Sequence, residues 1–131
     1  MNLLLDTHVL LWWLADDRRL GRAAAAAIAD PRNIVWVSAA SAWEIAIKVA
    51  LGRLDLGEPP EECLPREIED GGMRPLPIIV PHALAVRTLP DHHADPFDRL
   101  LIAQAVLDGL QIVTADSAFT AYGVSLLAAD R

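Results

Sequence analysis

Four acidic residues of this chain lie in apolar surroundings, where a carboxylate is costly to bury. They are Asp6 after a run of leucines, Glu44 between a tryptophan and an isoleucine, Asp98 in the segment Phe97–Ala103, and Asp116 after the run Ile112–Ala115. A buried carboxylate is unfavourable unless a positive group meets it. No matching set of basic residues is embedded in these segments, so the four acids suggest one shared partner. A divalent cation such as Mg²⁺ or Mn²⁺ fits, because these ions prefer carboxylate oxygens.

Each acid also has a purely structural interpretation. Asp6 or the adjacent Thr7 can cap a helix that begins near His8, and Asp116 can cap the short helix that follows it. Asp98 lies in the first turn of a helix that Asp95 caps, where the helix dipole favours an acid. Asp95 therefore reads as the cap, and Asp98 is the better ligand candidate.

Glu44 is open to three interpretations. With Ser41 it matches a capping box, in which its side chain returns to the start of the helix. If Ser38 caps the helix instead, Glu44 lies at mid-helix and is a site candidate. With Lys48 four residues later it also forms a possible exposed ion pair. The spacing alone does not choose among them.

The histidines offer little for a zinc site. His92 and His93 are adjacent, but a closed zinc site needs four nitrogen or sulfur ligands, and Cys63 is the only cysteine. We therefore expect no zinc, and we expect His8 to be a packed or capping residue.

Strands and helices alternate along the chain. Strands are expected at 2–6, 34–37, 111–114 and 124–127, and helices at 8–15, 20–29, from Ser38 or Ser41 to 51, 61–69, 80–89, 96–108 and 117–122. This order predicts an α/β fold with a mostly parallel sheet, in which ligands bind beyond the carboxyl ends of the strands. Asp6 and Asp116 both end strands. The segment Leu56–Pro77 is rich in proline and glycine, and we interpret it as a mobile insert or lid.

Length and composition set broad limits. The chain has 131 residues, 53% of them hydrophobic, and we expect a single domain over residues 1–131. One cysteine and no apolar run of membrane-spanning length favour a soluble cytoplasmic protein. The formal charge of −7 weighs against unaided binding to nucleic acid, but cations bound by the acids would offset it at the site.

Several motifs together resemble the PIN-domain toxins of the VapC type. They are Asp6-Thr7-His8 with Leu11-Trp12-Trp13, the segment Ser41–Lys48 with Gly52-Arg53-Leu54, the segment His92–Ala105, and Val113–Asp116 with Phe119 and Tyr122–Val124. They fall in the family's order from one end of the chain to the other, and His92–Ala105 is the most specific. Leu56–Pro77 carries no family motif.

The resemblance implies a PIN-like three-layer sandwich and a metal-dependent endoribonuclease, the toxin of a type II toxin–antitoxin pair. Asp6 and Asp98 would be the principal ligands of Mg²⁺ or Mn²⁺, Glu44 a ligand or the residue that orients the attacking water, and Asp116 the support of a second metal or its water shell. The implied partners are an RNA substrate, a cognate antitoxin and a second copy of the chain, with no membrane.

Two other classes of protein compete with this interpretation. A receiver-like signalling domain would need paired acids after the first strand and a lysine ending a late strand, and neither is present. A PIN-like module that binds RNA or a partner without cleaving remains the alternative, because the presence of four acids does not establish activity.

Overall fold

The computed structural model describes residues 1–131, and its core is one five-stranded sheet. The strands are β1 (Asn2–Leu5), β2 (Ile34–Ser38), β3 (Arg74–Leu76), β4 (Gln111–Thr114) and β5 (Leu126–Ala128). Their spatial order is β3-β2-β1-β4-β5, and every neighbouring pair is parallel. The expected α/β architecture is confirmed, with a sheet that is parallel throughout.

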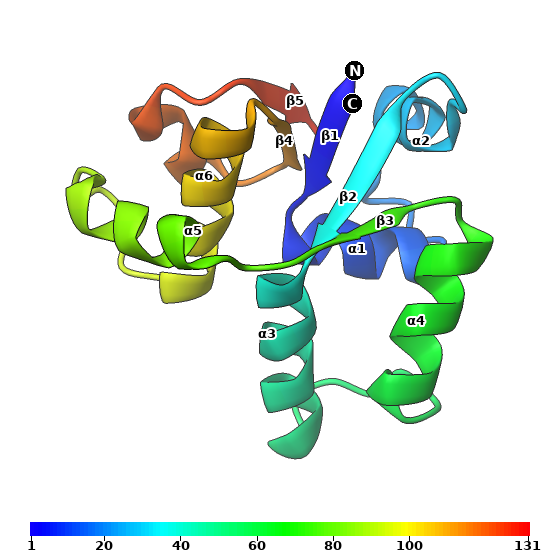
Figure 1. The fold of residues 1–131 in the computed structure, drawn as a ribbon. Helices are drawn as coiled ribbons and strands as arrows, with labels where there is room; N and C mark the ends of the chain where they lie inside the picture. The colour runs from blue at the N-terminus through cyan, green and yellow to red at the C-terminus, as the bar shows by residue number, and fades with distance from the viewer.

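Helices connect the strands and cover both faces of the sheet (Figure 1). They are α1 (Thr7–Leu14), α2 (Arg22–Ala29), α3 (Ala39–Ala50), α4 (Pro60–Asp70), α5 (Val80–Ala85) and α6 (Pro96–Asp108), with the 3₁₀ helices η1 (Val86–Thr88) and η2 (Ser117–Tyr122). The helix expected over 80–89 is thus divided into α5 and η1. No helix of the structure combines the length and apolar character that a membrane span requires.

Alternation along β1 divides the core between the two faces of the sheet. Leu3 and Leu5 belong to a cluster with residues of α1, α2 and α4. Leu4 points to the opposite face, into a cluster that includes Leu101 and Ile102 of α6. Successive side chains of a strand face opposite sides of a sheet, so this leucine run supplies both cores of a three-layer sandwich.

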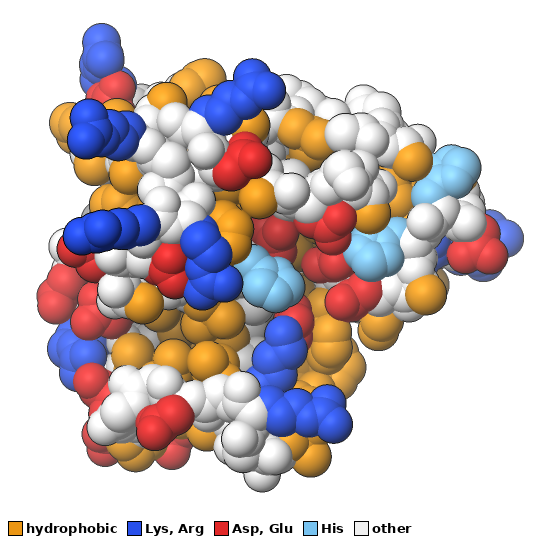
Figure 2. Space-filling view, turned by 180° about the vertical axis from the view of Figure 1, so that it is seen from behind, with side chains coloured by type: hydrophobic (Ala, Val, Ile, Leu, Met, Phe, Trp, Pro, Cys, Tyr) orange, Lys and Arg blue, Asp and Glu red, His pale blue; other side chains and the backbone are white.

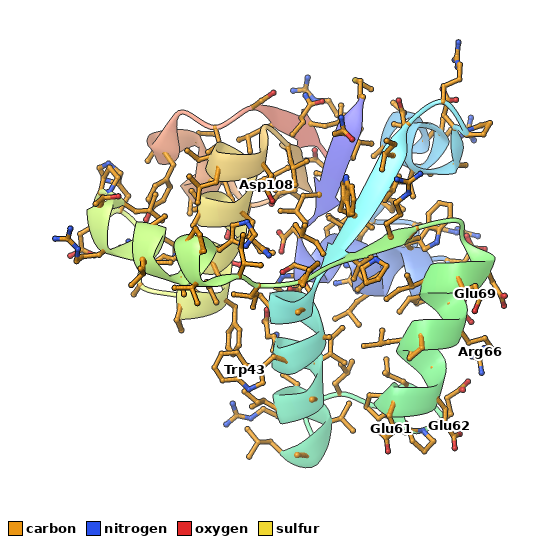
Figure 3. The ribbon with its side chains drawn as sticks, in the orientation of Figure 1. Trp43, Glu61, Glu62, Arg66, Glu69 and Asp108 are labelled. Carbon is orange, nitrogen blue, oxygen red and sulfur yellow. The ribbon has the colours of Figure 1, made fainter.

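The segment Leu56–Pro77 is an integral part of the fold, and its interpretation as a mobile insert or lid was wrong. It forms α4 and the edge strand β3, which pairs with β2 through Val37 and Pro75. Leu64 and Met73 are buried in the core, while Arg66 and Glu69 project from the outer side of α4 (Figure 3). Proline is tolerated in an edge strand because no neighbour needs its missing N–H, so the prolines did not exclude a strand here.

The order of the strands reverses direction at β1. The chain moves outward in one direction from β1 to β2 and β3, then returns to place β4 on the other side of β1. Ligands of parallel sheets bind at such a reversal, beyond the carboxyl ends of the strands on either side. In this chain those ends are followed by Asp6 and Asp116.

Candidate metal centre

Acidic side chains and histidines gather in a hollow on one face of the molecule, with lysine and arginine side chains around it (Figure 2). The strand ends, the first turn of α6 and the middle of α3 supply the acids. Four separate segments therefore converge on this region, as the positions of Asp6 and Asp116 at strand ends predict.

Asp6 is 3% exposed and is fixed by the neighbouring strand. Its Oδ2 accepts a hydrogen bond of 2.7 Å from the Thr114 hydroxyl, whose oxygen in turn accepts from the Asp116 backbone N–H at 3.0 Å. Burial raises the pKa of Asp6, and the nearby charge of Glu44 raises it further, while the Thr114 bond lowers it. The result is a carboxylate in an environment that disfavours its charge.

Glu44 lies in the middle of α3, because Ser38 caps that helix. The Ser38 hydroxyl accepts from the Ala40 N–H at 3.0 Å, and Ser41 is instead buried with its oxygen accepting from the Thr7 hydroxyl. The capping-box interpretation of Glu44 is therefore wrong. Glu44 is 6% exposed, so it belongs to the interior of the site.

The carboxylate of Glu44 is only half satisfied. Its Oε2 lies 2.8 Å from Lys48 Nζ, so the ion pair that the spacing allowed does form, but Glu44 is buried and the pair is not the exposed one expected. Its Oε1 is buried and has no hydrogen-bond partner. A buried carboxylate oxygen without a partner costs free energy, and a cation would supply the missing interaction.

Asp98 is held at the start of α6. Asp95 caps the helix, as expected, by accepting from the N–H groups of Phe97 at 2.9 Å and Asp98 at 3.3 Å. Asp98 Oδ2 lies 2.7 Å from His93 Nε2. Burial and the charges of Asp6 and Asp95 raise the pKa of Asp98 to about 7, despite the opposing effect of His93.

Asp116 serves two purposes at the end of β4. Its Oδ1 caps η2 by accepting from the Ala118 N–H at 2.9 Å, which is the structural interpretation of this residue. Its Oδ2 lies 3.7 Å from His93 Nε2. One ligand atom each from His93, Asp98 and Asp116 lies within 4.8 Å of the others, a spacing that suits a shared metal ion.

The structure groups the candidates differently from the sequence. The expected ligands Asp6 and Asp98 are close enough for the charge of Asp6 to raise the pKa of Asp98. The tightest set of ligand atoms, however, combines Asp98 with Asp116 and His93. His93 was not among the predicted site residues, although it lies in His92–Ala105, the most specific of the family motifs, five residues before Asp98. His8 is exposed rather than packed or capping.

An open groove of about 460 Å³ adjoins the acids. His8, Lys48 and Arg53 line it together with Glu44 and Phe97. Trp43 is 55% exposed and contacts Phe97 edge-to-face, with ring centroids 5.0 Å apart, and it projects from α3 (Figure 3). Basic and aromatic groups therefore border the route to the carboxylates.

The carboxylates, rather than any hydroxyl or thiol, define the chemistry available here. The only cysteine, Cys63, is buried in α4, and burial raises the pKa of its thiol. Oxygen ligands from several acids suit a hard divalent cation, and the unpartnered Oε1 of Glu44 and the raised pKa values of Asp6 and Asp98 are features that a cation would relieve. The residues present thus fit a metal centre.

Comparison with known proteins gives matches along most of the chain. Residues 3–124 match the PIN domain family. Ribonuclease VapC22 of Mycobacterium tuberculosis is 35% identical over 116 residues, which are 88% of this chain and 87% of that protein. Ribonuclease VapC16 of the same organism is 43% identical over a shorter stretch of 53 residues, 40% of this chain and 38% of that protein.

Solved structures share the fold at low sequence identity. The crystal structure of VapBC2 from Rickettsia felis, bound to a DNA fragment from its promoter, superposes with a TM-score of 0.74 at 13% identity, covering 97% of this chain and 98% of that chain. FitAcB from Neisseria gonorrhoeae superposes with a TM-score of 0.64 at 23% identity, covering 96% of each chain. The sequence match and the shared parallel sheet agree that the chain belongs to the PIN-domain family.

Proposed function

We propose that the protein is a metal-dependent endoribonuclease and the toxin of a toxin–antitoxin pair. The observation that carries this proposal is the convergence of Asp6, Glu44, Asp98 and Asp116 at the carboxyl ends of β1 and β4, in a chain whose relative VapC22 is a ribonuclease. One PIN-like domain, residues 1–131, would contain the whole site.

The four acids would hold Mg²⁺ or Mn²⁺. Asp98 occupies the central place, because Asp6 influences it electrostatically and His93 links it to Asp116. Asp6 and Asp98 would be the principal ligands, Asp116 would support a second ion or its water shell, and Glu44 would bind the metal or orient the attacking water. When bound, such ions supply a nucleophilic water and stabilise the charge that develops on the phosphate.

The residues around the acids would position the RNA. Arg53 is exposed in the groove and forms no ion pair, so its guanidinium is available to a phosphate. Lys48 is already engaged with Glu44 at 2.8 Å, so its ammonium is less available to a phosphate than Arg53 is. A groove with basic groups along its wall offsets, at the site itself, the net charge of −7 of the whole chain.

The test is cleavage of total RNA by purified protein freed of any bound antitoxin, with Mg²⁺, with Mn²⁺ and with EDTA. Metal-dependent cleavage at few sites that is lost in Asp98→Asn would support the nuclease and identify its target. If the folded, metal-loaded protein cuts nothing, the alternative of a PIN-like module that binds RNA or a partner without cleaving would replace it.

The toxin assignment rests on the resemblance to VapC-type toxins and on the relative VapC22, and it has its own test. We propose an antitoxin that blocks the site, a homodimeric toxin and action in the cytoplasm. Induced expression of the chain should arrest growth, Asp98→Asn should not, and co-expression of a small neighbouring gene should restore growth. Growth unaffected by the active nuclease would contradict a toxin.

A further inference from the structure

A single histidine nitrogen lies close to two acids of the metal centre. His93 Nε2 lies 2.7 Å from Asp98 Oδ2 and 3.7 Å from Asp116 Oδ2. Asp98 comes from α6 and Asp116 follows the end of β4, so this nitrogen lies between acids of two different elements. The side chain of His93 is 20% exposed, which leaves its contacts within the protein largely undisturbed by water.

The contact made by Nδ1, the other ring nitrogen of His93, indicates which of the two nitrogens carries the hydrogen. The backbone N–H of Asp95 points at His93 Nδ1 with a long N···N separation of 3.5 Å. An imidazole nitrogen that accepts an N–H carries no hydrogen itself, so in the neutral ring the hydrogen is on Nε2. His93 therefore donates from Nε2 to Asp98 Oδ2.

The ring and its loop are held from two sides. The ring of His93 packs edge-to-face against the fully buried Phe119, with centroids 6.2 Å apart. Arg99 donates to the backbone carbonyl of Pro90 at 3.0 Å, to that of His93 at 3.5 Å and to the Tyr122 hydroxyl at 3.3 Å. A guanidinium satisfied by several acceptors restricts the loop, and the orientation of His93 follows from it.

We propose that His93 is a positioning residue of the metal centre. The spacing of His93, Asp98 and Asp116 would also allow His93 to bind the ion itself, but its Nε2–H is already engaged with Oδ2 of Asp98. That contact leaves Oδ1 for the cation and fixes the carboxylate plane before the cation arrives. Groups that hold metal-binding carboxylates in this way contribute to affinity without touching the ion. This inference rests on the proposed function, because it assigns a role at the same site.

The affinity of the protein for Mn²⁺, measured without RNA, tests this role. We expect His93→Ala to weaken binding by about 10- to 100-fold. His93→Gln should restore most of the loss, because a glutamine amide can donate from the same place. The matched control is His92→Ala, since His92 is the adjacent histidine and its ring contacts Tyr122, with centroids 5.4 Å apart, rather than an acid; it should bind as the parent does.

Two spectroscopic measurements separate positioning from ligation and from mere packing. Nitrogen NMR of the metal-free protein should show His93 with its hydrogen on Nε2. In pulsed EPR of the Mn²⁺-loaded protein, any nitrogen coupling to the ion should remain unchanged in His93→Gln. The control is His8→Gln, because His8 is near Asp6 and could itself give a nitrogen coupling. A coupling that does disappear would make His93 a ligand and overturn the proposal.

The other outcomes of the Mn²⁺-binding measurements also test the role of His93. If His93→Gln binds as weakly as His93→Ala, the ring acts by packing, and if His93→Ala binds as the parent does, it has no role at the site. If the folded parent binds no Mn²⁺, both this inference and the metal-dependent function fail. Parent binding without an effect of His93 overturns this inference alone.

Discussion

Replacing Asp98 by asparagine should stabilise the metal-free protein at pH 8, although it should abolish the proposed activity. Burial and the charges of Asp6 and Asp95 raise the pKa of Asp98 from an ordinary 3.8 to about 7. The unfolded chain therefore releases this proton at lower pH than the folded protein does. Between these two pKa values the folded state binds more protons, so stability falls as the pH rises through the window.

The size of the effect follows from the pKa difference. One pKa unit between the folded and unfolded states corresponds to about 1.4 kcal/mol, so ionising Asp98 in the folded state costs at most about 4 kcal/mol. Between pH 5 and pH 8 the free energy of unfolding would fall by at most about 3 kcal/mol. Relaxation of water and neighbouring groups around the charge reduces this loss of stability, and we expect a loss of roughly 1–2 kcal/mol.

Urea unfolding in EDTA at pH 5 and pH 8 measures this directly. The parent should lose stability between the two pH values relative to Asp98→Asn, whose amide oxygen can still accept from His93. Asp130→Asn, a change at an exposed acid outside the site, should follow the parent. Mn²⁺ at pH 8 should restore the stability of the parent and leave Asp98→Asn unchanged. If Asp98→Asn is the less stable protein at pH 8 in EDTA, the contact of 2.7 Å with His93 is a net stabilising ion pair and the reasoning is refuted.

Three further substitutions test other parts of the account. Thr114→Val removes the 2.7 Å hydrogen bond to the buried Asp6 and should lower the free energy of unfolding by about 1–3 kcal/mol; an unchanged urea midpoint would show that water replaces it. Leu64 in α4 is 5% exposed, so Leu64→Ala should lower the free energy of unfolding by about 2–5 kcal/mol. A loss below about 1 kcal/mol would indicate that the segment Leu56–Pro77 is a loosely packed insert after all. Lys48→Met leaves the buried Glu44 without its ion-pair partner and should cost about 1–3 kcal/mol in EDTA; Mn²⁺ should reduce that loss, and an equal loss with and without Mn²⁺ would separate Glu44 from the metal centre.

The strand-end acids were predictable because a parallel sheet brings the carboxyl ends of its strands to one edge. The locations of Asp6 and Asp116 could be predicted from the positions of two strands alone. The location of Glu44 could not be predicted in this way. Whether its side chain returns to the helix start or enters the site depends on whether Ser41 or Ser38 caps the helix. Sequence spacing permits both caps, and only the packing of Ser41 against Thr7 selects one.

Other features depend on contacts between segments that are distant in the sequence. The strand β3 has three residues, one of them a proline, and exists because β2 offers a free edge. The hydrogen bond from His93 to Asp98 depends on a loop that Arg99 holds from α6. Nothing in the sequence position of Arg99 indicates that its guanidinium binds backbone carbonyls.

The central claim is that these carboxylates bind a divalent cation, and Mn²⁺ binding to the antitoxin-free protein tests it most directly. The informative variant is Asp116→Asn, because the asparagine oxygen can still cap η2 through the Ala118 N–H. The control is Asp91→Asn, an exposed acid in the loop of His93. We expect the parent and the control to bind equally and Asp116→Asn to bind at least about tenfold more weakly. A folded parent that binds no Mn²⁺, or an Asp116→Asn variant that binds as the parent does, would contradict the account.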